Sequence, residues 1–179
     1  MNKTTHKLDE ISFDIFSIDG VFGDGSHETT NMMLDLMKSC NLTNKSIIDI
    51  GTGTGILSVY AALRGAKNIL ALDINSTSLE WARKNFKHNN VNVDVEINNL
   101  TQYIDTKADI ILANLPPNMQ VENFRTVQKN LTEDGILIIS WLNDLKLESY
   151  TKDFEIIDHI KGNEYDVYIL KVLKKTLYK

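Results

Sequence analysis

Residues 46–57 read Ser46-Ile-Ile-Asp-Ile-Gly-Thr-Gly-Thr-Gly-Ile-Leu57, which sets three closely spaced glycines between an apolar run and a helical pattern. Such a turn lets the backbone pass close to a ligand and presents free amide N–H groups at the helix start. Gly51, Gly53 and Gly55 follow the spacing G-x-G-x-G, whereas dinucleotide-binding turns have G-x-G-x-x-G. The stretch predicts a ligand-binding turn after a buried strand, with a turn used only for tight packing as the alternative.

Two acidic residues accompany this turn. Asp49 stands two positions before the first glycine, where a carboxylate suits a ligand with a positive group, such as an amine or a sulfonium-bearing amino acid. Asp73 ends the next apolar run, about 20 positions beyond the turn, where a carboxylate can take both hydroxyls of a ribose. A helix-start carboxylate without a ligand is the alternative for Asp73. The neighbouring Thr52, Gly53 and Ile74 are further candidates for ligand contact.

The pattern outward from the turn alternates between strands and helices. Helical signals occur at residues 54–64, at residues 76–87 and after Pro117, and they separate apolar, β-branched runs. Continuous apolar runs are typical of strands buried on both faces of a parallel sheet, so the class is a doubly wound α/β fold. The seven expected strands are residues 46–50, 68–74, 91–97, 108–113, 135–142, 154–160 and 165–173.

The two ends of the chain depart from this alternation. The last two runs are joined by only residues 161–164, which is too short for a helical crossover and predicts an antiparallel hairpin. Residues 1–20 form an arm with exposed apolar positions, interpreted as a lid over the pocket or as a homodimer interface. A helix capped by Ser26 follows. The chain, residues 1–179, is expected to be one domain with a catalytic core over residues 21–179.

Composition bounds the function. The 179 residues carry a net charge of −5, which gives no general attraction to phosphate backbones, so a nucleic-acid partner is not expected. Apolar runs are far shorter than a bilayer span and no leader is evident, so we expect no membrane association and a cytoplasmic location. The single cysteine, Cys40, and scattered histidines predict no metal site.

The glycine turn and Asp73 together resemble the class I methyltransferases that depend on S-adenosylmethionine. The resemblance implies S-adenosyl-L-methionine as cofactor, bound at the strand ends of a seven-stranded, mostly parallel sheet whose last strand is antiparallel. It also places the residues after the third strand, Asn99 and Leu100, near the cofactor. Asparagine pairs are common in loops, so the adenine contact of Asn98 and Asn99 stays open.

A second segment narrows the resemblance. Phe22-Gly-Asp-Gly-Ser-His-Glu-Thr-Thr30 is similar to the F-G-T-G-T-H-x-T-T segment of the PrmA family, which methylates amino groups of a ribosomal protein. The similarity extends over residues 20–142. It implies cofactor contacts for Thr30, Gly51, Asp73 and Asn114, and a covering role for Phe22 and His27. A histidine that only orders the loop is the alternative for His27.

Two features differ from that family. Family members carry an N-terminal substrate-recognition domain, for which about 20 residues leave no room, and they have A-N-I-L-A where this chain has Ala113-Asn-Leu-Pro-Pro-Asn118. The latter is similar to the [DNS]-[PL]-P-x loop of methyltransferases that act on nitrogen. Asn114 and Pro116 are therefore the expected catalytic residues, because an amide oxygen and proline-flanked carbonyls can accept hydrogen bonds from an acceptor N–H. A rigid turn is the alternative.

Methyl transfer from a sulfonium is an in-line displacement, so holding the nucleophile close to the methyl group supplies much of the rate. A charged amine must first lose a proton, to water or to Glu28 or Asp24. The sequence thus predicts an N-methyltransferase for an amine of a small molecule or peptide. Alternatives are a protein lysine or N-terminal amine methyltransferase, a carbon or oxygen target, and a catalytically silent cofactor-binding subunit.

Overall fold

The computed structural model describes residues 1–97 and 106–173. Its centre is a seven-stranded sheet with the order β5-β4-β3-β6-β7-β9-β8, in which β9 is antiparallel to both of its neighbours. The other neighbouring strands are parallel, which confirms the predicted fold and its C-terminal hairpin. The strands are β3 (Ile47–Ile50), β4 (Ile69–Asp73), β5 (Asp94–Ile97), β6 (Ala108–Ala113), β7 (Leu131–Leu142), β8 (Phe154–Ile160) and β9 (Tyr165–Val172).

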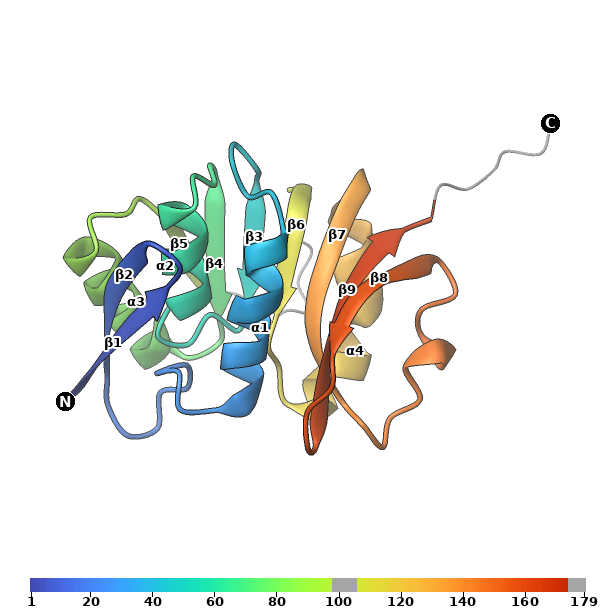
Figure 1. The fold of residues 1–179 in the computed structure, drawn as a ribbon, viewed down its shortest axis with the longest axis horizontal. Helices are drawn as coiled ribbons and strands as arrows, with labels where there is room; N and C mark the ends of the chain where they lie inside the picture. The colour runs from blue at the N-terminus through green and yellow to red at the C-terminus, as the bar shows by residue number, and fades with distance from the viewer. Residues whose placement is uncertain (98–105, 174–179) are drawn as a thin grey trace.

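Helices cover both faces of this sheet, as expected where parallel strands are apolar on both sides (Figure 1). The first apolar layer contains residues of α1, α2 and α3, and the second contains residues of α4 together with Trp141 and Leu147. Trp141 is fully buried, so it belongs to the core and not to a pocket wall. The helices are α1 (Glu28–Ser39), α2 (Ile56–Leu63), α3 (Ser76–His88), α4 (Pro117–Lys129) and the 3-10 turn η1 (Leu147–Ser149).

The cap of α1 differs from the predicted one, whereas α3 begins at Ser76 as predicted. The N-cap of α1 is His27, whose ring Nδ1 accepts from the Thr29 amide, and not Ser26. Ser26 instead donates to Asp24. The N-cap of α3 is Asn75, because its side-chain oxygen accepts from the Thr77 amide. Asparagine and serine cap about equally well, so local sequence alone does not choose between neighbours.

The N-terminal arm is a second, two-stranded sheet, β1 (Asn2–Leu8) and β2 (Ile11–Ser17), paired as an antiparallel hairpin. Phe13 and Ile15 of β2 are fully buried in the same core as α1 and α2. The arm thus packs on the helical layer through its second strand, and its role as a lid stays a prediction. The same packing removes the reason for expecting a homodimer through this arm, because its apolar side chains are buried within the chain.

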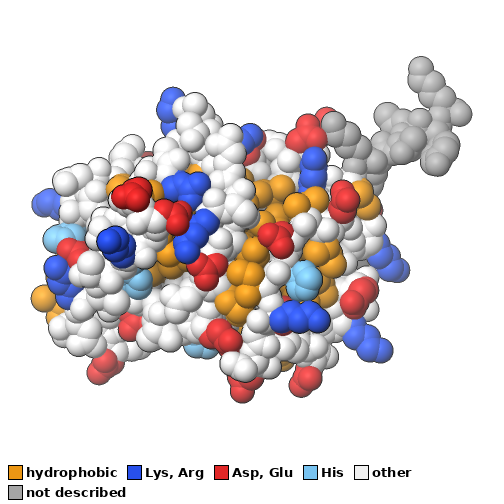
Figure 2. All heavy atoms as spheres, in the orientation of Figure 1, with side chains coloured by type: hydrophobic (Ala, Val, Ile, Leu, Met, Phe, Trp, Pro, Cys, Tyr) orange, Lys and Arg blue, Asp and Glu red, His pale blue; other side chains and the backbone are white. Residues whose placement is uncertain are grey.

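One face of the molecule carries an apolar area over β8 and β9 beside α1, while acidic and basic side chains are scattered over the rest of that face (Figure 2). Ile156 and Ile157 of the edge strand β8 are about half exposed. Within the described ranges, no helix is long and apolar enough to cross a membrane. Cys40 is partly buried, and burial raises the pKa of its thiol.

Candidate active site

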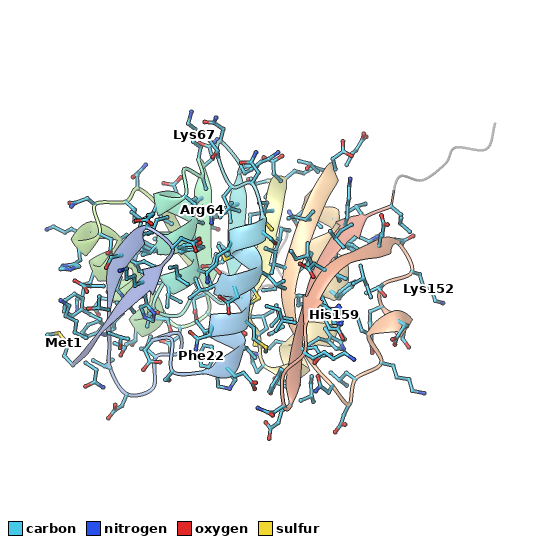
Figure 3. All side chains as sticks on the ribbon, in the orientation of Figure 1. Met1, Phe22, Arg64, Lys67, Lys152 and His159 are labelled. Carbon is cyan, nitrogen blue, oxygen red and sulfur yellow. The ribbon has the colours of Figure 1, made fainter. Side chains whose placement is uncertain are left out.

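The predicted ligand-binding residues meet at one edge of the sheet. The arrowheads of β3, β4 and β6 point to the same edge, and the loop that carries Phe22 lies there as well (Figures 1 and 3). Arg64 and Lys67 mark the opposite edge in Figure 3. The carboxyl ends of parallel strands beside a reversal in strand order form the usual ligand crevice of such sheets, and the reversal here is between β3 and β6.

The glycine turn needs its glycines. Gly51 and Gly53 have φ values of +70° and +55°, a region that side chains rarely adopt. A Cβ on Gly53 would also collide with the backbone oxygen of Phe22, and one on Gly51 would collide with the Leu115 side chain. The turn is thus closed from outside by the Phe22 loop, and the Thr54 amide donates to the Phe22 oxygen over 2.9 Å.

Asp73 lies at the end of β4 with its carboxylate against this turn. One oxygen accepts from the Gly53 amide over 3.0 Å and the other from the Asn75 amide over 2.8 Å. The residue is 8% exposed and lines a cavity of about 220 Å³. Each carboxylate oxygen has a further lone pair, so Asp73 can still accept hydrogen bonds from two neighbouring hydroxyls.

Asp49 takes a different place from the one expected. It is buried behind the turn, where a single oxygen accepts from the hydroxyls of Thr52 and Ser58, each over 2.7 Å. Burial raises its pKa to about 6, against the lowering effect of these two hydrogen bonds. Neither Asp49 nor Thr52 lines the cavities at this edge. In this geometry they hold the turn in shape from behind.

Asn114 follows β6 and joins this edge to α1. Its side-chain nitrogen donates to the hydroxyl of Thr30 over 3.3 Å, with the amide oriented by that contact. Thr30 is fully buried and lines neither cavity. Its contact with the site is the hydrogen bond that it accepts from Asn114. The amide oxygen of Asn114 remains able to accept a hydrogen bond from a ligand.

Two cavities meet at Asn114. The first, of about 220 Å³, holds the predicted cofactor residues Gly51, Gly53, Asp73 and Ile74. The second, of about 270 Å³, lies toward α1 and β9 and includes His27 and Tyr165. Four residues line both: Phe22, Asn114, Leu115 and Pro116. A ligand in one cavity therefore has a direct neighbour in the other.

Phe22 and His27 form a partly exposed cover at this junction. The Phe22 side chain is 48% exposed, and its ring centroid lies 5.2 Å from that of His27. His27 in turn lies 6.1 Å from the ring of Tyr165. His27 also caps α1, and the covering role that the sequence resemblance implied for both residues stays a prediction.

The predicted proton acceptors do not enter either cavity. Glu28 accepts from the side chain of Asn163 over 3.1 Å, in the loop between β8 and β9. Asp24 is engaged by Ser26, whose hydrogen bonds lower the pKa of this carboxyl. Asn99 and Leu100 lie outside the described residues, so their cofactor contact stays a prediction.

The structure adds residues that the sequence analysis did not single out. Ser140 and Tyr165 line the second cavity, while Gly20, Asn75, Ser78 and Met119 line the first. A register argument could have found Ser140, because it follows Ile139, the last residue of β7 that pairs with β6. Tyr165 follows only from the antiparallel turn at the far end of the chain. Among the described residues, no cluster of histidine, cysteine or acidic side chains fits a metal ion.

The model of the PrmA family, described as ribosomal protein L11 methyltransferase, matches residues 18–171. The chain belongs to this family. A relative named ribosomal protein L11 methyltransferase, from Thermosipho africanus, is 31% identical over 151 residues, or 84% of this chain. The match covers 58% of that relative, so the chain spans little more than half of its length.

Solved structures of methyltransferases superpose on this chain. A ribosomal protein L11 methylase from Lactobacillus delbrueckii subsp. bulgaricus superposes with a TM-score of 0.76 at 26% identity, covering 83% of this chain and 80% of that one. A Pyrococcus abyssi tRNA (uracil-54, C5)-methyltransferase in complex with S-adenosyl-L-homocysteine gives 0.71 at 18% identity, covering 95% and 44%. The second likeness shows the fold alone.

Family and fold confirm the predicted resemblance to class I methyltransferases and S-adenosyl-L-methionine as the family's cofactor. The residues present fit that group. Asp73 would offer a carboxylate to two ribose hydroxyls, and Ile74 and Met119 line the same cavity with apolar side chains that a base could contact. The turn at Gly51 and Gly53 leaves backbone instead of side chains beside the ligand.

Proposed function

We propose that this chain is an S-adenosylmethionine-dependent N-methyltransferase acting on an amine of a small molecule or peptide. The observation that carries the proposal is the junction of two cavities at Asn114 and Pro116. One cavity contains the Asp73 carboxylate, and the other has polar groups that accept hydrogen bonds. Two adjoining sites of this kind suit a transfer between two bound molecules.

The cofactor, when bound, would supply a sulfonium methyl group for the lone pair of the acceptor nitrogen, with a thioether as the leaving group and a proton released to solvent. The protein's own part is positioning. Asp73 and the glycine turn hold the cofactor, and Asn114 accepts a hydrogen bond from the acceptor N–H. Phe22 and His27 restrict water at the junction. Correct placement of two reactants can supply most of the acceleration in such a displacement.

Among the described residues that line the second cavity, His27 is the one side chain that can carry a charge at neutral pH. Moving an amine from water into such surroundings disfavours its charged form. We therefore assign proton loss to desolvation and to solvent, and Glu28 to the contact with Asn163 that ties α1 to the β8–β9 turn. Catalysis by Glu28 stays a prediction without a geometric basis.

The family favours a second candidate acceptor, an amine of a protein. The relatives are named for ribosomal protein L11, and the chain spans only part of them. Protein L11 and a panel of small amines are therefore the substrates to compare. A silent cofactor-binding subunit is disfavoured by the formed acceptor cavity next to Asn114. The predicted cytoplasmic location stays a prediction.

Calorimetric titration tests the proposal. Wild type should bind S-adenosylmethionine, and both Asp73→Asn and Asp73→Ala should weaken binding more than about 10-fold, because each removes charge-assisted hydrogen bonds worth about 1.5–3 kcal/mol apiece. Asp35→Asn, an exposed acidic residue paired with Lys38, is the control and should bind as wild type does. Mass spectrometry of the amine panel and of protein L11 then identifies the methylated product. Absence of binding by wild type would end the proposal.

A further inference from the structure

The Phe22 loop, residues 20–27, is held by contacts on two sides. On the inner side, the Thr54 amide of the glycine turn donates to the Phe22 oxygen over 2.9 Å. On the outer side, the ring Nε2 of His6 in β1 lies 3.1 Å from the backbone oxygen of Asp24. The loop therefore lies between the glycine turn and the N-terminal hairpin.

The His6 ring also packs directly on this loop at Gly25. Gly25 has a φ of +87°, and a Cβ at this position would collide with the His6 ring. Only a glycine allows so close an approach. On the hairpin side, the His6 ring stacks on Phe13 with 5.3 Å between the ring centroids, and Phe13 is buried in the core. His6 thus connects the core to the Phe22 loop.

The proton on His6 can be assigned from its surroundings. Burial lowers the pKa of His6, against the raising effects of Asp24 and Asp14, so the ring is neutral at pH 7 and carries one N–H. The backbone oxygen of Asp24 can only accept a hydrogen bond. We therefore assign the proton to Nε2, which donates to the Asp24 oxygen.

The position of Phe22 depends on how its loop is held. Three of the six residues 20–25 are glycines, which lose more conformational freedom on folding than other residues. Contacts with the rest of the protein must therefore offset this cost. The hydrogen bond from His6 fixes the backbone two residues beyond Phe22, and it thereby restricts the directions in which the Phe22 ring can point.

We propose that His6 is a positioning residue for the cofactor, because its bond to Asp24 and its packing on Gly25 hold the Phe22 ring at the junction of the two cavities. This inference rests on the proposed function. Phe22 lines both cavities, whereas His6 is not among the residues that line either. When only a fraction of the molecules is competent to bind a ligand, the apparent affinity falls by that fraction. His6 thus raises cofactor affinity through the loop.

Calorimetric titration with S-adenosylhomocysteine tests this role, at a temperature where every variant is folded by circular dichroism. His6→Ala should weaken nucleoside binding about 3- to 10-fold, the worth of one net hydrogen bond. His6→Gln should restore most of the affinity, because its amide nitrogen can donate to the same backbone oxygen.

His88→Ala is the matched control. His88 contacts the same hairpin from α3, with its Nε2 atom 3.3 Å from the Asp14 carboxylate and its ring centroid 4.8 Å from that of Phe16. This variant should bind the nucleoside as wild type does. The control separates support of the Phe22 loop from general stabilisation of the hairpin.

A double-mutant cycle tests whether His6 acts through the Phe22 ring. The ring is absent in Phe22→Ala, so adding His6→Ala to this variant should change nucleoside affinity by less than about 2-fold. The same substitution in wild type should cost the full 3- to 10-fold.

Hydrogen exchange measured by NMR tests the support of the loop without any nucleoside. The Thr54 amide donates to the Phe22 oxygen, so it should exchange about 3- to 10-fold faster in His6→Ala than in wild type. The amides of β3 should keep their exchange rates, and His88→Ala should leave the Thr54 rate unchanged.

Four outcomes would overturn the inference: equal nucleoside affinity in wild type and His6→Ala, no rescue by His6→Gln, an equal loss with and without the Phe22 ring, or an unchanged exchange rate at Thr54. A lower melting temperature with unchanged affinity would show that His6 only stabilises the fold. Failure of wild type to bind S-adenosylhomocysteine would instead contradict the proposed function, and the exchange rate at Thr54 would then decide the role of His6.

Discussion

At the scale of single residues, the two carboxylates near the glycine turn, Asp73 and Asp49, have different surroundings and therefore different roles. Asp73 is bonded to backbone amides and faces a cavity, whereas Asp49 is enclosed behind the turn by hydroxyls. The sequence predicted ligand contact for both. Asp49 is buried, and a buried carboxylate needs hydrogen-bond partners from the protein itself because no water surrounds it. Its partners are the hydroxyls of the turn, so we interpret Asp49 as a residue that holds the turn in shape.

The raised pKa of Asp49 predicts a pH dependence of stability. Its folded value of about 6 exceeds the ordinary 3.8, so the native state binds more protons between these values and its stability falls as pH rises. The contribution of Asp49 to the free energy of unfolding is fully present below pH 3.8. It is lost as the pH rises through 6, by about 3 kcal/mol at most. Urea unfolding of Asp49→Asn from pH 4 to 8 should lack this loss.

The comparison is the difference between wild type and variant at each pH, which removes titrations common to both proteins. Asp35→Asn is the control and should keep the wild-type profile, because this carboxylate is exposed beside Lys38. An Asp49→Asn profile parallel to that of wild type would show that a group other than Asp49 carries the dependence.

At the scale of elements, the N-terminal hairpin is joined to α3 by one buried asparagine. Asn85 accepts from the Phe16 amide and donates to the oxygens of Phe16 and Thr54. Thr54 belongs to the glycine turn, so a single side chain connects β2, α3 and the cofactor turn. The hairpin also reaches the Phe22 loop, where His6 contacts the Asp24 oxygen over 3.1 Å.

Asn85→Ala should lower the free energy of unfolding by about 3 kcal/mol, because it leaves buried backbone groups of Phe16 and Thr54 without a partner. Asn89→Ala provides a matched comparison. Asn89 makes similar bonds to the backbone of Asp14 at a partly exposed position, where water can replace them, so about 1 kcal/mol is expected. Equal losses in chemical denaturation would show that burial does not set the cost.

At the scale of the whole molecule, the proposed cofactor cavity is built from loops that follow three strands and from the Phe22 loop before α1. A ligand there binds the folded chain and not the unfolded one, so it must raise the melting temperature. The rise in melting temperature depends on the cavity being formed at this edge of the sheet, and it can be measured without a methyl acceptor.

S-adenosylhomocysteine at about 100 times its dissociation constant should stabilise the fold by about 2.7 kcal/mol. For a chain of this length that corresponds to roughly 5–10 °C in scanning calorimetry. Asp73→Ala at the same nucleoside concentration should shift by only a small fraction of this. A similar shift in both proteins would place the nucleoside away from Asp73.

The local sequence determined most of the fold and part of the site. Apolar runs, the positive-φ glycines and the short link at residues 161–164 act over a few neighbours, so they predicted the sheet, the turn at Gly51 and the final hairpin. The place of Asp73 and Asn114 could be predicted because Asp73 ends β4 and Asn114 follows β6, and parallel strands end at one edge.

Tertiary structure alone decided the rest. One face of β2 packs on helices up to some 70 positions away, and Glu28 accepts a hydrogen bond from Asn163 of a distant turn. Ser140 lies beside Asn114 only through the register of β6 and β7. Such contacts depend on which elements pack together. The local sequence around one residue does not indicate which distant residue it will contact. The acceptor cavity is therefore a property of the assembled sheet.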